Sequence, residues 1–311
     1  GGLAGTGPGG RVIERDVAAA LLARPPLTAA ARAAVLSGEK APPAGTGMGG
    51  RITLEDIAGA RRGDADIPGM VPSFQDEGEV TRTPIRGIRK VIASRMFQSL
   101  AESAQFTLNT NAPAARLQEL RARFKVSRER GFDGLSDITI NDLVLFAVSR
   151  TLPRFPFMNA HKNGDTLTTF ERVHLGMAVD TPRGLMVPVI RNASLLTLKQ
   201  IAEEAGRLAG ACQNGTVKQE ELGGSTFTVT NLGSLGITGF TPILNVPEVA
   251  ILGVCGIELK PVPDGDGAAF EPRMGLSLTI NHEVVDGAPA ARFLAGLCGA
   301  VGNIDLLLAG G

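Results

Sequence analysis

The chain has 311 residues, of which 43% are hydrophobic, and this is enough for one large domain with a smaller one or for two of medium size. Its 31 basic residues balance its 31 acidic residues, which argues against binding to nucleic acid or to a membrane surface through bulk charge. No run of about 18 apolar residues is present, so we expect no membrane-spanning helix.

Three cysteines lie far apart in the sequence and show no Cys-x-x-Cys spacing: Cys212, Cys255 and Cys298. An odd number without a framework predicts buried thiols in a reducing cytosol, with neither disulfides nor a zinc site. We therefore expect a cytoplasmic protein that holds no metal ion. The chain begins with Gly1 in the middle of a repeated motif and shows no secretory signal, so we also expect it to be truncated at its N-terminus.

Two copies of a short motif lie near the N-terminus, AGTGPGGRVIERDVAAA (4–20) and AGTGMGGRITLEDIAGA (44–60), and they agree at ten of 17 positions. Each predicts a glycine-rich loop followed by a short helix that begins near Glu14 or Leu54. Both copies also match the Gly-x-Gly-x-x-Gly pattern of dinucleotide-binding loops, which requires a buried strand directly before the glycines. The second copy follows SGEKAPP instead, so we expect the glycines to serve turn geometry.

Between the copies, PPLTAAARAAVLSG (25–38) predicts an alanine-rich helix with Thr28 as its N-cap. This helix and the second loop and short helix form a unit that is small enough to be marginally stable alone, and such a unit usually exists to bind something. Arg51, Arg61 and Arg62 are either cations that meet an acidic partner or solvated surface charges, and the sequence alone favours neither.

Residues 63–80 contain five acidic residues, no basic ones, and several glycines and prolines without any helical or strand period. This composition predicts a linker. We therefore divide the chain into a partial unit at 1–23, a small helical unit at 24–62, the linker at 63–80 and one large domain at 81–311.

In the large domain, GIRKVIASRMFQSLAESA (87–104) predicts a helix, and one face of it carries Ile88, Val91, Ile92, Met96 and Leu100. The segment TINDLVLFAVSRTL (139–152) predicts another, capped by Thr139. Further helices are expected at 197–213 and 288–308, and strands at 173–180, 185–190, 225–232, 249–258 and 274–282. Because this order lacks βαβ regularity, we expect a mixed α/β sandwich and not a doubly wound parallel sheet.

The segment NHEVVDGAPAARF (281–293) holds one of only three histidines, His282, at the end of an apolar strand. Fixed backbone beside a turn is a common place for catalytic residues. Asp286 stands four residues later, where it either supports the histidine or caps the final helix. His161 is expected in an exposed polar turn and His174 on one face of a strand. Spacing alone leaves both the catalytic and the structural interpretation of His282 open.

The string His-Glu-Val-Val-Asp-Gly at 282–287 matches the His-x-x-x-Asp-Gly signature of CoA-dependent acyltransferases. The fuller stretch SLTINHEVVDGAPAARFL (277–294) resembles the dihydrolipoyl acyltransferase component of 2-oxo acid dehydrogenase complexes. The same family is indicated, in the family's order, by RKVIASRM, TINDLVLFAV, VDTPRGLMVPVIRNA, FTVTNLGSLGITGFTPILNVPEVAILGV and NIDLLL. The two glycine-rich motifs resemble that family's peripheral-subunit-binding domain, so the resemblance covers nearly the whole chain.

The resemblance implies a chloramphenicol-acetyltransferase-like sandwich that transfers an acyl group between a dihydrolipoyl thiol and coenzyme A. It implies that His282 is the base, that Thr230 in FTVTNLG donates a hydrogen bond to the oxyanion, and that Asp286 positions the loop through an arginine. Arg89 and Arg95 are both candidates for that arginine. Gly287 is expected to permit the turn, while no motif marks the residues that bind coenzyme A.

The resemblance also implies trimers that assemble into larger cores, with His282 and Thr230 of one site coming from different chains. The subunit-binding units would dock the 2-oxo acid decarboxylase and the dihydrolipoyl dehydrogenase, with Arg11 and Arg51 in contact with these partners. A lipoyl domain, with its lysine in an Asp-Lys-Ala or Asp-Lys-Val turn, does not occur in this sequence. The lipoyl group is therefore expected on a domain absent from this chain.

The acyl group is not marked by any motif, because acetyl, succinyl and branched-chain relatives share these strings. TPRGLMVPVIRNA is most similar to acetyl-transferring members that serve pyruvate or acetoin. Two alternatives stay open. One is a non-catalytic scaffold that only holds partner enzymes, although such a protein would be expected to lose its histidine. The other is an antibiotic acetyltransferase, which would not need the binding units.

Overall fold

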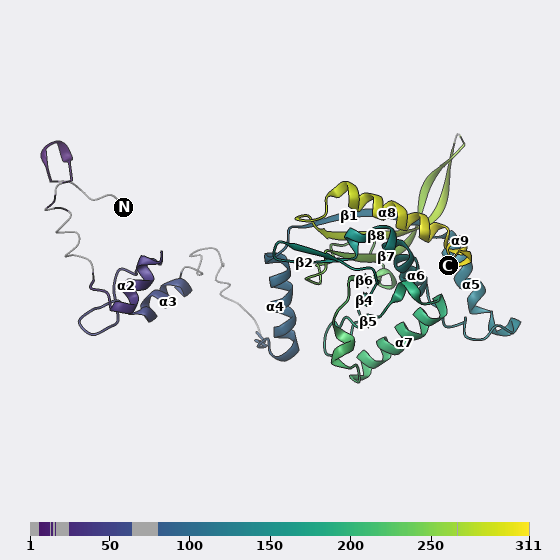
Figure 1. Ribbon diagram of the computed structural model, residues 1–311, viewed down its shortest axis with the longest axis horizontal. Coiled ribbons are helices and arrows are strands. Elements are labelled where there is room, and N and C mark those ends of the chain that lie inside the picture. Colours follow the sequence, from purple (N-terminus) through teal and green to yellow (C-terminus); the bar gives the residue numbers. More distant parts are fainter. Residues whose placement is uncertain are drawn as a thin grey trace. The chain divides into compact units, whose positions relative to one another are not determined.

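The computed structural model describes residues 6–12, 14, 16, 25–63, 80–265 and 267–310. It divides into two compact units, Gly1–Arg82 and Thr83–Gly311 (Figure 1). Nearly all of the expected linker at 63–80, and most of the helix expected after Glu14, lie outside the described residues. None of the described helices is long and apolar enough to cross a membrane.

The small unit is built from helices α2 (Ala29–Leu36) and α3 (Leu54–Gly63). Thr28 caps α2 as expected, since its Oγ1 accepts the Ala31 N–H at 3.3 Å. The two helices share a core of three buried residues, Ala31, Ile52 and Ile57. A core this small can contribute little stability.

The glycine loop before α3 has the turn geometry that the sequence predicts. A side chain at Gly45 would place its Cβ 2.3 Å from the Arg51 carbonyl, and Gly49 and Gly50 have φ of +73° and +74°. Only glycine fits such close backbone approach and left-handed turns. Residues 39–45 before the loop form no strand, which excludes the dinucleotide-binding interpretation.

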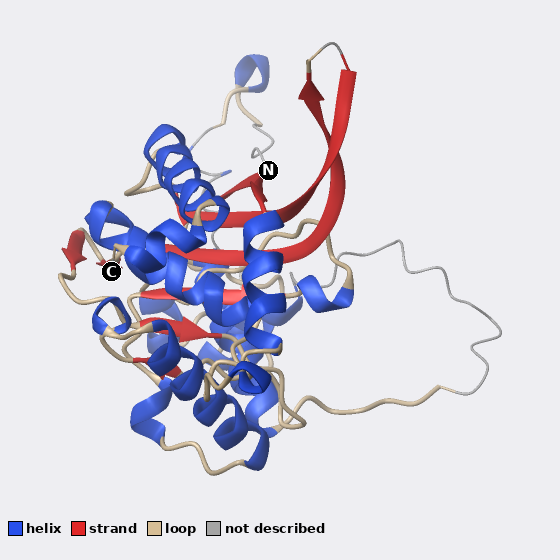
Figure 2. Ribbon diagram, turned by 90° about the vertical axis from the view of Figure 1, so that its right-hand side faces the viewer, coloured by secondary structure: helices blue, strands red, loops and turns tan. Residues whose placement is uncertain are grey.

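The large unit contains a mixed six-stranded sheet in the order β1-β8-β7-β6-β4-β5 (Figures 1 and 2). Strand β6 runs parallel to β4 and β7, and the other pairs are antiparallel. Beside it lies a separate two-stranded hairpin, β2-β3. The strands are β1 (Gln105–Pro113), β2 (Ala160–Asn163), β3 (Thr166–Thr169), β4 (Leu175–Met177), β5 (Val189–Ile190), β6 (Phe227–Asn231), β7 (Ala250–Asp264) and β8 (Gly267–Asn281). The prediction of a mixed α/β sheet is confirmed.

Helices α5 to α9 share the main core with one face of the sheet. On β8 the alternate residues Leu276, Leu278 and Ile280 are buried in that core, while Ser277 and Thr279 face the other side. The helices are α5 (Ala115–Lys125), α6 (Ile140–Thr151), α7 (Leu198–Asn214), α8 (Gly287–Gly302) and α9 (Ile304–Ala309), with α4 (Gly87–Ala101) outside this layer. Capping boxes begin α6 at Thr139 and α7 at Thr197, as their sequences favour.

Several elements differ from expectation. The apolar stripe of α4 does not join the core, because Val91 and Leu100 are 52% and 54% exposed and Ser99 is the only buried residue of the helix. The helix expected at 288–308 is interrupted at Asn303. Strand β1, helix α5 and the β2-β3 hairpin lie outside the predicted elements, and β4 and β5 are shorter than expected.

The last two strands are much longer than the rest of the sheet. Each of β7 and β8 spans 15 residues. Their far ends project beyond the body of the large unit as a twisted two-stranded ribbon (Figures 1 and 2).

Candidate active site

His282 follows the last residue of β8, where the sheet gives way to a turn. Its N–H donates to the Ala104 carbonyl at 2.8 Å. Its imidazole lies edge-on to the Phe106 ring, with centroids 5.2 Å apart, and its side chain is 43% exposed. The backbone of His282 is therefore fixed by the sheet, and the ring is supported on one side and open to a substrate on the other.

Asp286 lies close to His282 but does not bind it tightly. The Asp286 Oδ1 is 3.8 Å from His282 Nδ1, which is longer than a hydrogen bond. Asp286 is the N-cap residue of α8, yet its side chain accepts no helix N–H and is 83% exposed. Among the described residues, neither Arg89 nor Arg95 forms an ion pair with Asp286, so the structure shows no arginine partner for it there.

Gly287 begins α8 and does not have the positive φ that would require glycine. A Cβ placed there would lie 3.5 Å from the Phe106 ring, an ordinary contact. The backbone conformation of Gly287 therefore gives no reason for glycine at this turn, and its role there stays a prediction. Its structural place is beside the ring that supports His282.

Thr230 lies near the end of β6, half-buried, and its hydroxyl makes no hydrogen bond to another described residue. It pairs with Gly253 of β7, which pairs with Ser277 of β8, five residues before His282. At about 3.3 Å per residue along a strand and about 4.8 Å between strands, Thr230 and His282 are on the order of 20 Å apart. One chain therefore does not bring the expected base and the expected oxyanion donor together.

The loop after β6 is held rigidly beside Thr230. Asn231 donates from Nδ2 to Asn141 Oδ1 at 2.9 Å, and its Oδ1 accepts the Gly233 N–H at 2.8 Å. Gly233 has no room for a side chain, because a Cβ would lie 2.6 Å from the Cys255 carbonyl oxygen. Thr230 is thus fixed on a preorganised strand end, as an oxyanion donor must be.

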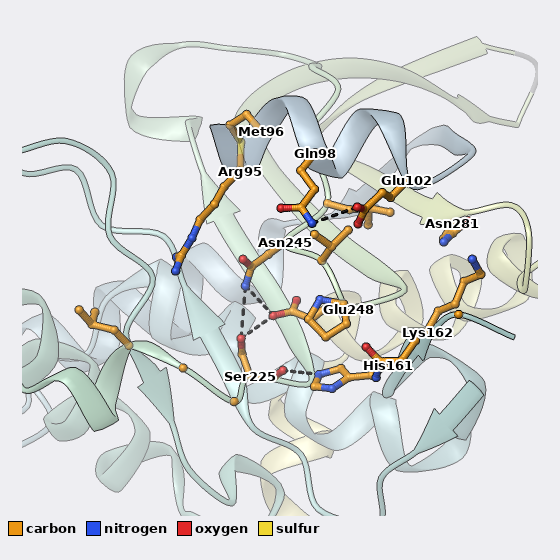
Figure 3. Close-up of a pocket in the computed structure, with 18 residues that line it drawn as sticks. Arg95, Met96, Gln98, Glu102, His161, Lys162, Ser225, Asn245, Glu248 and Asn281 are labelled. Atoms are coloured by element: carbon orange, nitrogen blue, oxygen red, sulfur yellow. Dashed lines mark hydrogen bonds between the residues drawn. The ribbon is translucent and has the colours of Figure 1, made fainter. Parts of the chain in front are cut away.

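The sequence interpretation missed a buried acid, Glu248, which lines a cavity of about 730 Å³ beneath α4 (Figure 3). Its Oε1 accepts hydrogen bonds from Thr228 at 2.9 Å, from Asn245 at 2.8 Å and from Ser225, while Oε2 has no partner. Burial raises the pKa of Glu248 to about 7. One signal was available, a lone acid just before the apolar run VAILGV.

The rings of the other two histidines form hydrogen bonds with backbone groups. His161 lies on β2, half-buried and not exposed as expected, with Nε2 at 2.7 Å from the Ser225 carbonyl. His174 precedes β4, and its Nδ1 accepts the Asn192 N–H at 3.1 Å. Burial, together with Arg191, lowers the pKa of His174. Of the three histidines, His282 is the one with an exposed side chain.

Among the described residues, no group of three or more His, Cys, Asp or Glu side chains could hold a metal ion. All three cysteines are free thiols in the structure; Cys212 and Cys255 are buried, and Cys298 is only partly buried.

The chain is similar to known proteins over most of its length. Residues 77–309 match the family model of the 2-oxoacid dehydrogenases acyltransferase catalytic domain. The acetyltransferase component of the acetoin cleaving system of Bacillus subtilis is 40% identical over 218 residues, 70% of this chain and 54% of that protein. The acetyltransferase component of the Cupriavidus necator pyruvate dehydrogenase complex is 35% identical and covers 93% of this chain. The chain spans about half the length of these two relatives, 54% and 48%.

Solved structures show the same relationship. The structure of Azotobacter vinelandii dihydrolipoamide acetyltransferase, determined to investigate the catalytic role of a serine, a histidine and an asparagine, matches with a TM-score of 0.70 at 35% identity. The match covers 78% of this chain and the whole of the Azotobacter chain. The cubic core of the pyruvate dehydrogenase multienzyme complex matches equally well. The chain therefore belongs to the family of 2-oxo acid dehydrogenase acyltransferases.

Proposed function

We propose that this chain transfers an acetyl group between coenzyme A and a dihydrolipoyl thiol, as the core of a pyruvate or acetoin dehydrogenase complex. The relatives reported above are acetyltransferase components of such systems. The lipoyl group would be carried by a domain outside this sequence, and coenzyme A would enter as the second substrate.

The observation that carries the proposal is the spacing of three residues. In the Azotobacter enzyme the serine precedes the histidine by 52 residues, and the asparagine follows it by four. In this chain Thr230 precedes His282 by 52 residues and Asp286 follows it by four. Threonine keeps the hydroxyl of serine, and aspartate keeps a side-chain oxygen at the position of the asparagine.

The chemistry follows from the thiol. A free thiol has a pKa of about 8.5 and is mostly protonated at neutral pH. His282 takes its proton as the sulfur attacks the thioester carbonyl, a contribution of about 10²–10⁴-fold. The tetrahedral oxyanion accepts a hydrogen bond from Thr230, worth roughly 3–4 kcal/mol. Its collapse expels the other thiolate, which recovers the proton from the imidazolium.

The separation of about 20 Å between Thr230 and His282 supports a site shared by two copies of the chain, with one residue from each. The cubic core of the pyruvate dehydrogenase complex is an assembly of such domains. We therefore place the reaction at an interface within a trimer or larger core. Asp286 can also find its cationic partner there, since its carboxylate is exposed in the single chain.

We also propose that both N-terminal motifs dock partner enzymes, the 2-oxo acid decarboxylase and the dihydrolipoyl dehydrogenase. Their loops make the same hydrogen bonds. The Thr6 N–H donates to Asp16 at 2.8 Å and the Thr46 N–H to Asp56 at 3.0 Å. In each loop the second glycine N–H donates to the carbonyl of an exposed arginine at 2.9 Å, Arg11 or Arg51. The side chains of Arg61 and Arg62 lie outside the described residues.

The test is acetyl transfer from acetyl-CoA to free dihydrolipoamide, which replaces the absent lipoyl domain. His282→Ala should lower the rate by 10² or more, because the attacking thiol loses its base. Glu283→Ala is the matched control, an exposed neighbour whose carboxylate forms an ion pair with Lys162, and it should keep the rate. An assembled wild-type chain that transfers neither acetyl, succinyl nor isobutyryl groups would establish the scaffold alternative instead.

A further inference from the structure

Two of the residues that hold His282 stand on either side of Gln105, at the start of β1. Ala104 accepts the His282 N–H, and Phe106 supports the imidazole edge-on. Gln105 itself pairs with Asn281, the residue before His282, in the register of β1 and β8. The position of the imidazole therefore depends on how firmly this end of β1 is held.

The side chain of Gln105 points to the other face of the sheet. Successive side chains on a strand alternate between the two faces, so Gln105 lies on the face opposite to Phe106. There its Nε2 donates to Ser99 Oγ and to Ser103 Oγ, each at 3.0 Å. Its Oε1 accepts the Leu244 N–H at 3.2 Å. One side chain thus joins β1 to the end of α4 and to the loop before β7.

Helix α4 depends on polar contacts of this kind. Ser99 is its one buried residue, and the Ser99 hydroxyl donates to the Leu244 carbonyl at 2.6 Å. The apolar stripe of the helix is exposed, and the cavity of about 730 Å³ lies beneath it (Figure 3). Apolar packing therefore does little to fix this end of α4, and the hydrogen bonds around Gln105 hold it against β1.

The loop that receives Gln105 is itself fixed to the body of the large unit. Leu244 is fully buried. The next residue, Asn245, donates from Nδ2 to Glu248 Oε1 at 2.8 Å and to Ser225 Oγ at 3.4 Å. Gln105 therefore links the strand beside His282 to groups that are already held in place.

We propose that Gln105 is a positioning residue for acetyl transfer. From the far face of the sheet it holds Ala104 and Phe106 where they orient the His282 imidazole toward the attacking thiol. The inference rests on the proposed function, in which His282 is the base. A base must lie within hydrogen-bond reach of the proton that it takes, and a displacement of about 1 Å can lower a rate by about 10²-fold.

The first test is Gln105→Met, which keeps the length of the side chain and removes its hydrogen bonds. We expect kcat for acetyl transfer to fall by about 10- to 10²-fold, with the KM for acetyl-CoA unchanged. Gln98→Met is the matched control, since Gln98 is exposed on α4 and its amide donates to Glu102 at 3.0 Å. It should keep the wild-type kcat. A wild-type kcat in Gln105→Met, in a chain that His282→Ala inactivates, would refute the inference and leave the proposed function standing.

The second test asks whether Gln105 acts through His282. In chains that already carry His282→Ala, Gln105→Met should leave the residual rate unchanged, because there is no imidazole left to position. A residue that only stabilises the fold or the assembly would lower the residual rate by the same factor as it lowers the wild-type rate. That result would contradict a positioning role.

Hydrogen exchange tests the contact without any activity, and so separates failure of the inference from failure of the proposed function. In Gln105→Met the His282 amide should exchange about tenfold faster than in wild type, while amides near Leu278 in the middle of β8 keep their rates. Unchanged exchange at His282, or equal acceleration along the whole of β8, would count against the inference.

Ser99→Ala covers the case in which Gln105→Met does not fold. This variant removes one hydroxyl that accepts from Gln105 and donates to Leu244. It should give the same pattern, with a smaller loss of kcat and faster exchange confined to the His282 end of β8. A variant with wild-type kcat and wild-type exchange would show that these bonds do not position the imidazole.

Discussion

At the scale of single residues, Glu248 shows how one side chain couples the fold to pH. Its pKa in the folded protein is about 7, above the ordinary value of 4.5, because burial disfavours the charged carboxylate. The folded state therefore holds the proton more tightly than the unfolded state does. The associated stability is fully present below pH 4.5 and is lost as the pH rises through 7.

Glu248→Gln should remove this dependence. Glutamine retains a carbonyl oxygen for the Ser225, Thr228 and Asn245 donors and carries no charge. We expect the free energy of unfolding of the variant, relative to that of wild type, to rise by up to about 3 kcal/mol from pH 4 to pH 8. Urea unfolding at both pH values measures this, and an equal difference at the two values would contradict the buried ionisation.

Thr230 tests the oxyanion hydrogen bond. Thr230→Val removes the hydroxyl with little change in shape, and we expect kcat for acetyl transfer to fall about 10²–10³-fold. Thr230→Ser keeps the hydroxyl and should stay within a few-fold of wild type. Equal losses in both variants would show that strand packing, and not the hydroxyl, is what matters at this position.

At this scale the sequence allows predictions where a residue belongs to a motif that a family shares. His282, Thr230 and Asp286 stand in motifs whose order is shared by a family, so they could be assigned before the fold was known. Glu248 could not, because Ser225 and Thr228 become its neighbours only when β6 and β7 align. The sequence also does not reveal the φ of Gly287, which is not positive in the structure.

At the scale of elements, the glycine loop and α3 depend on one carboxylate. The Asp56 side chain accepts hydrogen bonds from the N–H and the hydroxyl of both Thr46 and Thr53, and these bonds lower the pKa of Asp56 to about 2. Their contribution is present above pH 3.8 and is lost as the pH falls through 2.

Asp56→Ala should loosen the small unit and leave the large one intact. The amides of Thr46 and Thr53 lose their acceptor, so at pH 7 their hydrogen exchange should become at least tenfold faster. Glu55→Ala is the control, since this neighbouring exposed acid on α3 makes none of these bonds. Unchanged exchange at Thr46 in the Asp56 variant would show that the glycine turn is stable without the hydrogen bonds to Asp56.

Elements with strong local signals could be predicted to within a residue or two, as α6 and α7 show with their capping boxes. The failures have a common cause. The stripe on α4 was correctly identified as apolar, but periodicity does not say which surface covers it. Strand β1 (QFTLNTNAP) alternates polar residues with Phe106, Leu108 and Ala112, which is a strand signal, but no local pattern shows that it pairs with β8.

At the scale of the whole molecule, the sequence indicated a mixed sheet with helices, and the sheet order explains why its functional residues are split. Thr230 lies two strands away from β8, and its register partner on β8, Ser277, is five residues before His282. No local pattern encodes that separation, because it arises from strand register. The apolar stripe of α4 is likewise left exposed in the single chain.

The distance between Thr230 and His282 has a consequence for genetics. If each site contains one residue from each of two chains, a chain defective in His282 alone inactivates one site in a mixed ring. A chain defective in both residues spoils two, one on each side of itself. In cells that make wild-type and mutant chains, the allele defective in His282 alone would leave an activity proportional to the fraction of wild-type chains. The allele defective in both residues would leave an activity proportional to the square of that fraction.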